Sequence, residues 1–239
     1  MKKIIDNFEN KVRYKLYRTI PEIIHPSISK KNISNYKIVL EDRLIPIRVF
    51  YPEMVSNIDN VIIYIHGENN SPKKGYKYGD ISRLFAKELK SLVISIDYDD
   101  DGTLKKLVKN IFPTCKYIVD EFNKLGIKNI SICGDSMGAN IALEISKLLD
   151  NSYLKLVLFY PQIISKAKIK KNIYNPNIPS LTILGSADTN YSILVNMYKE
   201  LDNKMHKLIE LEFQPHAFLN SITNEEKNII FDSIDKFIK

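Results

Sequence analysis

The chain has 239 residues, of which 44% are hydrophobic and 26% charged, a composition typical of a globular protein with a substantial core. Two cysteines exclude a disulfide framework, no apolar run reaches the roughly 18 residues of a membrane span, and acidic residues interrupt any signal-type start, so we expect a cytoplasmic protein. The net charge of +7 is spread along the chain without an RNA-binding or zinc-finger signature, which predicts a solvated surface and no nucleic-acid partner.

An amphipathic helix is predicted near the start of the chain. Hydrophobic side chains recur at steps of four residues from Ile4 to Ile20, with lysines and arginines between them, and Pro21 ends the pattern. We expect this helix to pack on the rest of the protein; contact with an anionic membrane surface is the alternative. Residues 1–34 are thus an N-terminal helix and connection, a candidate cap element, and residues 35–239 form a single domain.

The pattern from residue 35 onward predicts an α/β fold. Extended segments at 35–41 and 44–52 flank a polar turn and predict an antiparallel hairpin. Short apolar runs then alternate with stretches of helical spacing, at 61–65, 92–97, 129–133, 154–160, 181–184 and 207–213. This alternation predicts a mostly parallel, doubly wound sheet with the N-terminal antiparallel hairpin and with helices on both faces. Ligands bind such sheets at the carboxyl ends of strands, so functional residues should directly follow strands.

Local signals predict where several helices begin and which side chains they bury. Asp80 is the predicted N-cap of a helix whose apolar stripe starts at Ile81, and a capping-box pattern precedes the last helix. The residues of that capping box are Thr223 and Glu226. After residue 136, helical spacing places three apolar side chains on one face: Ile141, Ile145 and Leu148.

The segment "GDSMG" at 134–138 predicts a nucleophilic serine. It follows a strand and precedes a helix, so Ser136 should lie exposed on a tight turn with positive φ, where Gly134 and Gly138 leave room for neighbouring backbone. The Met137 N–H, at the start of the helix, would then stabilise negative charge on an attacked carbonyl oxygen. The alternative is a glycine-containing turn with an incidental serine.

A second oxyanion donor is expected after the strand at 61–65. His66 and Gly67 end that run, and the backbone N–H of Gly67 or Glu68 could approach the serine turn. An ordinary loop with a surface histidine is the alternative.

The general base and its acid are predicted by position. A nucleophilic serine needs a base, and the base needs an orienting carboxylate. Among the four histidines His216 follows the last strand, and Asp188 lies just past the strand before it. Asp135 is adjacent to the serine, and we expect its side chain to point away and brace the loop. Ser136, Asp188 and His216 therefore form a candidate triad in which each residue follows a strand.

These segments make the chain similar to the α/β-hydrolase superfamily, in which the triad occurs in the order Ser, Asp or Glu, His. "GDSMG", "IPIRVFYPE", "VIIYIHG" and "ISIDY" resemble segments of the hormone-sensitive-lipase-like carboxylesterases and acetyl esterases, over roughly residues 35–238. The resemblance implies a serine carboxylesterase that acts on a small-molecule ester through an acyl-enzyme, without cofactor or metal.

The chain departs from that family in three segments. The family has His-Gly-Gly-Gly where this chain has Glu68 and Asn69 after Gly67, and "DYDDDGTLKKL" replaces the usual continuation after Asp-Tyr. The segment 161–180 is short, so we expect a small or minimal lid and a preference for esters of small or short-chain acyl groups.

The sequence leaves several functions open. A thioesterase, a deacetylase or a small-amide hydrolase would use the same triad, and a non-catalytic binding protein would retain the fold alone. The acyl group, the alcohol and the oligomeric state have no signal in the sequence.

Overall fold

The computed structural model describes residues 33–40, 43–53, 58–67, 76–98, 102–127, 129–149, 153–162, 174–201 and 204–239. The predicted amphipathic helix, most of the predicted lid segment, Glu68 and Asn69 lie outside these residues. The division into an N-terminal cap element and one domain therefore stays a prediction.

The described residues form one sheet of eight strands in the order β1-β2-β4-β3-β5-β6-β7-β8. The strands are β1 (Ile33–Leu40), β2 (Arg43–Phe50), β3 (Asn60–Ile65), β4 (Leu92–Ile96), β5 (Asn129–Asp135), β6 (Leu154–Phe159), β7 (Ser180–Gly185) and β8 (His206–Leu211). β1 pairs antiparallel with β2, and β2 with β4, while all other pairs are parallel. The predicted hairpin and the mostly parallel sheet are confirmed.

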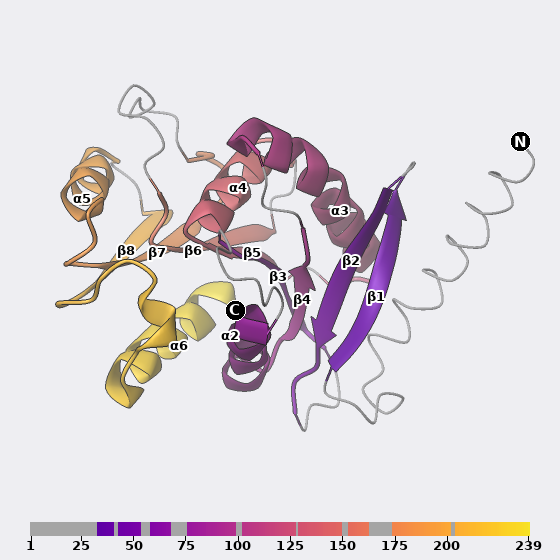
Figure 1. The fold of residues 1–239 in the computed structure, drawn as a ribbon, viewed down its shortest axis with the longest axis horizontal. Coiled ribbons are helices and arrows are strands. Elements are labelled where there is room, and N and C mark those ends of the chain that lie inside the picture. Colours follow the sequence, from indigo (N-terminus) through magenta and orange to yellow (C-terminus); the bar gives the residue numbers. More distant parts are fainter. Residues whose placement is uncertain are drawn as a thin grey trace, which may run out of the picture.

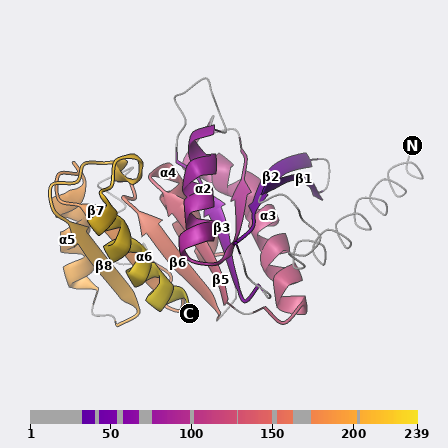
Figure 2. The ribbon, with the colours of Figure 1, turned by 90° about the horizontal axis from the view of Figure 1, so that it is seen from below.

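Helices cover both faces of the sheet, as predicted (Figure 1). They are α2 (Tyr76–Glu88), α3 (Leu104–Lys124), α4 (Met137–Ser146), α5 (Tyr191–Glu200) and α6 (Asn224–Ile238), with a 3₁₀ turn η2 (Phe218–Asn220) before the last. Figures 1 and 2 show α3 and α4 on one face and α2 and α6 on the other. In the described part of the chain, no helix is long and apolar enough to cross a membrane.

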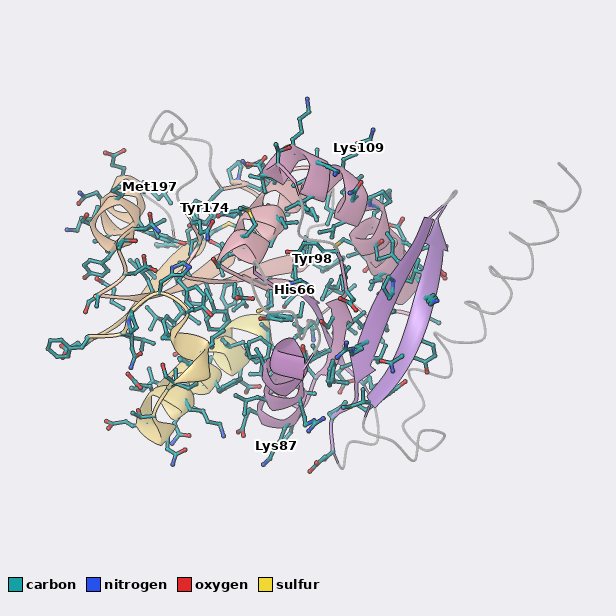
Figure 3. The ribbon with its side chains drawn as sticks, viewed as in Figure 1. His66, Lys87, Tyr98, Lys109, Tyr174 and Met197 are labelled. Carbon is teal, nitrogen blue, oxygen red and sulfur yellow. The ribbon has the colours of Figure 1, made fainter. Side chains whose placement is uncertain are left out.

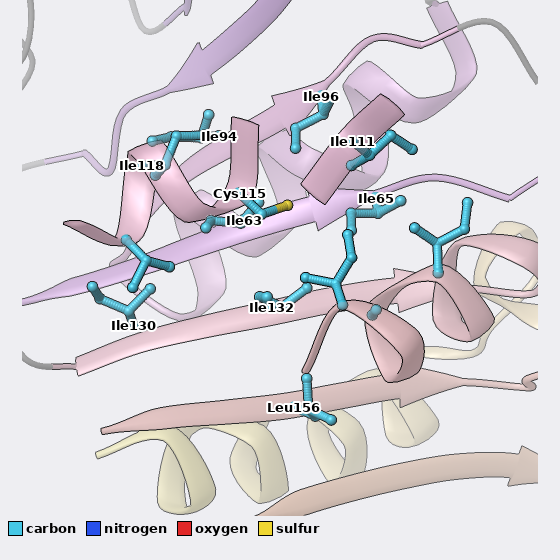
Figure 4. Close-up of a cluster of buried hydrophobic side chains, with 14 of the residues drawn as sticks. Ile63, Ile65, Ile94, Ile96, Ile111, Cys115, Ile118, Ile130, Ile132 and Leu156 are labelled. Atoms are coloured by element: carbon cyan, nitrogen blue, oxygen red, sulfur yellow. The ribbon is translucent and has the colours of Figure 1, made fainter. Parts of the chain in front are cut away.

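The central strands are buried on both faces, which explains their near-continuous apolar sequences. Every residue of β3 and β4 is buried. On the α3 face, Ile63, Ile65 and Ile132 belong to one cluster of buried apolar side chains, to which that helix contributes (Figure 4). A second cluster, centred on Phe85 and Phe159, fills the space under α2 and α6. The two cores fix the sheet between its helices and so fix where each strand ends.

Two local predictions about helices are wrong. Helix α2 begins at Tyr76, so Asp80 lies inside it and is not its N-cap. The prediction rested on an apolar stripe that starts only at Ile81 and carries no information about the preceding turn. Leu148 lies beyond the end of α4 and is 57% exposed, whereas Ile141 and Ile145 are fully buried. The capping box of Thr223 and Glu226 is confirmed at the start of α6.

The order of the strands creates one topological switch point. From β3 the chain passes to β4 on one side, and after α3 it returns to form β5 on the other side of β3. The segments after β3 and β5 thus lead to helices on opposite faces of the sheet, the arrangement at which open α/β sheets bind ligands. His66, Gly67 and Ser136 lie at this point.

The central strands should carry most of the stability. Replacing Ile132, which is fully buried in β5, by Ala should lower the free energy of unfolding by about 2–5 kcal/mol, because the cavity and the lost apolar burial add. Ile229→Ala on α6, where the side chain is 46% exposed, is the matched control and should change it by about 0.5 kcal/mol or less. Urea denaturation compares them; equal losses would contradict this core assignment.

Candidate active site

Ser136 occupies a tight turn between β5 and α4. Its backbone has φ of 51° and ψ of −117°, a left-handed conformation that a residue with a side chain adopts only when its surroundings impose it. The Ser136 N–H donates to the carbonyl of Phe159 at 3.0 Å, which ties the turn to the end of β6. The residue is 9% exposed, less than the sequence suggested, because neighbouring loops crowd the turn.

Glycines on both sides of the serine allow this turn. A Cβ at Gly134 would lie 2.4 Å from the Gly138 carbonyl oxygen, and a Cβ at Gly138 would lie 2.0 Å from the carbonyl oxygen of Ile65. Both distances are far below a van der Waals contact, so neither site admits a side chain. The two glycines therefore let α4 start against the ends of β3 and β5.

Ser136, His216 and Asp188 form one hydrogen-bonded row. Ser136 Oγ lies 2.9 Å from His216 Nε2, and His216 Nδ1 lies 2.6 Å from Asp188 Oδ2. An ionised carboxylate only accepts hydrogen bonds, so the Nδ1–H donates to Asp188 and Nε2 is left to accept the Ser136 hydroxyl. The structure thus brings together the three side chains that the sequence singled out.

The Asp188 loop follows β7 and is held against the His216 loop. A Cβ at Gly185 would lie 2.0 Å from the carbonyl oxygen of Gln214, and that oxygen accepts the Ala187 N–H at 3.0 Å. The Asp188 carboxylate is buried and its Oδ1 accepts the Asn190 N–H at 2.8 Å. Burial alone would raise its pKa, but the hydrogen bonds from His216 and Asn190 outweigh it, and the pKa of Asp188 is lowered. The carboxylate therefore stays ionised.

Aromatic packing orients the His216 ring. The ring of Tyr160 meets it at 62° with centroids 4.9 Å apart, and Phe218 packs edge-on against Tyr160. The His216 side chain is 32% exposed, so solvent reaches the imidazole that bridges the serine and the aspartate.

The loop after β3 packs against the serine turn. A Cβ at Gly67 would lie 3.0 Å from Ser136 Cβ and 2.9 Å from the Asp135 carbonyl oxygen, so only a glycine fits at this distance. The Gly67 N–H donates to Asp135 Oδ1 at 3.0 Å. Because this N–H already serves the carboxylate, it is not directed at an incoming carbonyl in this arrangement. Of the two predicted donors in this loop, Glu68 lies outside the described residues.

Asp135 braces this loop, as the sequence suggested. Its Oδ1 also accepts the Tyr64 hydroxyl at 2.6 Å. Burial raises the pKa of Asp135, and the hydrogen bonds from Tyr64 and Gly67 only partly counter that effect. The same burial, together with the Asp135 charge, raises the pKa of Tyr64 well above its usual value.

The contacts of His66 hold the start of the loop after β3. Its ring stacks on Tyr98 with centroids 4.3 Å apart, and the Tyr98 hydroxyl donates to the His66 carbonyl. Figure 3 shows the two side chains next to each other in the middle of the molecule. The stack holds the start of the loop after β3 in place.

Gln162 contacts the serine and was missed by sequence reasoning. It lies just beyond β6, and its Nε2 donates to Ser136 Oγ at 2.9 Å. The Asn140 side chain on α4 donates in turn to the Gln162 carbonyl at 2.9 Å. The available signal was its position as a polar residue shortly after a strand, but a triad needs a carboxylate at such a position and an amide does not meet that need.

A second serine–histidine pair lies elsewhere in the sheet. Ser180 Oγ and His206 Nδ1 are 2.9 Å apart, but they sit at the amino ends of β7 and β8, opposite the edge where Ser136 lies. Both are buried, and the neighbouring ring of Tyr174 belongs to a polar cluster under α5. Burial lowers the pKa of His206, which keeps the imidazole neutral. This pair links β7 to β8, the last strand of the sheet, and stabilises that side of the sheet.

A family model described as the alpha/beta hydrolase fold matches residues 62–220, two thirds of the chain. The chain belongs to this family. The matched range contains most of β3, all of β4 to β8 and all three residues of the hydrogen-bonded row. The resemblance to hormone-sensitive-lipase-like esterases inferred from the sequence is thereby confirmed. No curated protein sequence matches the chain significantly.

Solved structures of similar fold span nearly the whole chain. An esterase of Pyrobaculum calidifontis is 16% identical with a TM-score of 0.69, covering 98% of this chain and 92% of its own. The thermostable carboxylesterase EstE1, cloned from a metagenomic library, is 17% identical with a TM-score of 0.69, covering 98% and 97%. The Francisella virulence factor BioJ is 17% identical with a TM-score of 0.66, covering 98% and 90%. At these identities the likeness shows the fold.

Asp135 should make stability depend on pH. Its folded pKa lies above the ordinary carboxyl value of about 3.9, so the folded state binds the proton more tightly than the unfolded state. Stability contributed by this group is therefore lost as pH rises from the unfolded pKa through the folded one. Asp135→Asn keeps an oxygen that can accept from Tyr64 and Gly67, and it removes the titration.

The test is the free energy of unfolding of both proteins, by urea denaturation, between pH 3.5 and neutrality. The difference, variant minus wild type, should increase as pH rises through this range. A difference that stays constant, or that decreases with pH, would contradict the raised pKa of the buried carboxyl.

Proposed function

We propose that the protein is a serine hydrolase that cleaves carboxylic esters of small or short-chain acyl groups through an acyl-enzyme. The observation that carries the proposal is the hydrogen-bonded row of Ser136, His216 and Asp188, with the serine held at positive φ on a strand-to-helix turn. An imidazole that accepts the hydroxyl proton, and a buried carboxylate that orients the imidazole, make a serine nucleophilic, while the strained turn presents its Oγ.

Acylation begins when Ser136 Oγ attacks the ester carbonyl. His216 Nε2 takes the hydroxyl proton as the Oγ–C bond forms, and Asp188 stabilises the resulting imidazolium. Its lowered pKa suits this role, because a protonated aspartic acid could not balance the positive charge. The imidazolium then gives the proton to the leaving alcohol, and the C–O bond to that alcohol breaks.

Deacylation repeats these steps with water. His216 removes a proton from the water that attacks the acyl carbon, and it returns the proton to Oγ as the Oγ–C bond breaks. We assign one oxyanion donor to the N–H of Met137, which as the first N–H of α4 has no acceptor within its own helix. Because Gly67 donates to Asp135, we assign the second to the Glu68 N–H.

The ester class is supported by several solved structures of similar fold that are esterases. Thioesters, acetylated compounds and small amides follow the same chemistry, and a panel of substrates that differ only in the leaving group separates them. The proposed preference for small acyl groups rests on the short segment 161–180.

A non-catalytic ligand-binding protein is the second candidate. The observation that favours it is the engaged Gly67 N–H, which removes one expected oxyanion donor. Turnover that depends on Ser136 would exclude this candidate.

Ser136→Ala should abolish the hydrolysis of p-nitrophenyl acetate above background and leave the fold intact. Ser180→Ala is the matched control, because it also breaks a serine–histidine hydrogen bond of 2.9 Å but at the amino ends of the strands, opposite to Ser136. The Ser180→Ala protein should retain wild-type turnover per folded molecule, with the folded fraction measured by circular dichroism. Wild-type turnover in Ser136→Ala, or loss only in Ser180→Ala, would overturn the assignment.

Asp188→Asn should lower kcat by about three to four orders of magnitude with little change in KM. The amide can donate to His216 Nδ1 and so favours the tautomer whose Nε2 carries the proton and cannot accept from Ser136. Steady-state kinetics on the same ester measures the effect. A loss below tenfold would show that Asp188 does not set the tautomer of His216.

A further inference from the structure

Ser136 Oγ has two side-chain partners, although a triad supplies only one. His216 Nε2 and Gln162 Nε2 each lie 2.9 Å from it. A hydroxyl has one O–H to donate and two lone pairs that accept. The O–H goes to His216 and one lone pair accepts the Gln162 amide N–H, which leaves the other lone pair for attack on a carbonyl.

A hydrogen bond to the backbone of Gln162 fixes the position from which its side chain reaches Ser136. Asn140 lies on α4, one turn beyond Ser136, and its side chain donates to the Gln162 carbonyl at 2.9 Å. Asn140 is itself buried, and its N–H contacts the Ser136 carbonyl at 3.4 Å. One helical turn therefore positions both the serine and the residue that donates to it. The half-buried Gln162 is the third residue after the end of β6.

We propose that Gln162 is a further catalytic residue, whose side-chain N–H stabilises the negative charge that develops on Ser136 Oγ. This inference rests on the proposed function. As His216 removes the hydroxyl proton, Oγ gains charge, and a hydrogen bond to a charged acceptor is stronger than one to a neutral acceptor. The bond is therefore worth more in the transition state than in the resting enzyme, which is the condition for acceleration.

The same donor acts in both half-reactions. In acylation Oγ loses its proton to His216 and forms the bond to the acyl carbon. In deacylation the Oγ–C bond breaks, its electron pair returns to Oγ, and His216 gives back the proton. Oγ carries partial negative charge in each case, so one fixed N–H serves both steps without moving.

The test uses Gln162→Met, which keeps the length of the side chain and removes the donor. Two rates are measured on folded protein: steady-state hydrolysis of p-nitrophenyl acetate, and the rate constant for modification of Ser136 by a fluorophosphonate. Gln162→Leu is the second variant, in case the methionine alters folding. Gln214→Met is the matched control. It removes a side-chain amide that donates to Glu226 at 2.6 Å and does not contact Oγ, and it keeps the backbone carbonyl that accepts the Ala187 N–H.

The expected result is a fall of about tenfold or more in kcat and in the modification rate constant for both Gln162 variants, with KM within about twofold of wild type. Gln214→Met should stay within about twofold in both rates. The modification step involves no ester substrate, so its fall identifies a contact with Oγ.

Three results would overturn the inference alone. Unchanged rates in the Gln162 variants would remove any role for the donor, and a raised KM with an unchanged modification rate would mean that the amide contacts the substrate instead. An equal fall in both rates for Gln214→Met would mean that the loss comes from a general loosening of the site, and this result would also contradict the inference. A wild type that neither hydrolyses the ester nor reacts with the probe would instead overturn the proposed function.

Discussion

The backbone of Ser136 imposes the main constraint on this structure. A residue with a side chain at φ of 51° is strained, at a cost of about 1–3 kcal/mol, and only its surroundings can hold it there. Those surroundings are backbone atoms: Gly138 lies against the ends of β3, Gly134 lies against Gly138, and Gly67 approaches Ser136 itself. Three segments meet because each has a glycine at the point of contact. This backbone conformation directs Oγ toward the loops that follow β6 and β8.

The order of the strands determines which side chains those loops place next to Ser136. Parallel strands end at one edge, so the segments after β5, β6, β7 and β8 reach Ser136 from neighbouring positions. They deliver a serine, a glutamine, an aspartate and a histidine, and their side chains make a continuous set of hydrogen bonds. Two buried hydrogen bonds outside this set, which the Tyr64 hydroxyl and the Gly67 N–H donate to Asp135, hold the loop after β3. The arrangement thus depends on two apolar cores that fix the strands and on polar side chains at the carboxyl ends of those strands.

Most of the fold was predictable because strands and helices differ in hydrophobic period. Apolar runs located all the described strands to within about two residues, and the order of serine, aspartate and histidine followed from where those strands end. Single side chains were less predictable. Leu148 fits a helical face, yet the helix stops before it. The Gly67 N–H, one of the two candidate oxyanion donors in its loop, donates to a buried carboxylate that no local pattern indicates. Gln162 was missed since its role depends on a contact across 26 residues that no local pattern encodes.

The central claim is that Ser136 is an activated nucleophile. The most direct measurement is intact-mass analysis after exposure to a fluorophosphonate, followed by peptide mapping of the modified residue. One stoichiometric adduct on Ser136 is the predicted result, because the probe reacts with a serine whose proton a neighbouring base can accept. An unmodified folded protein, or an adduct on another residue, would contradict the account.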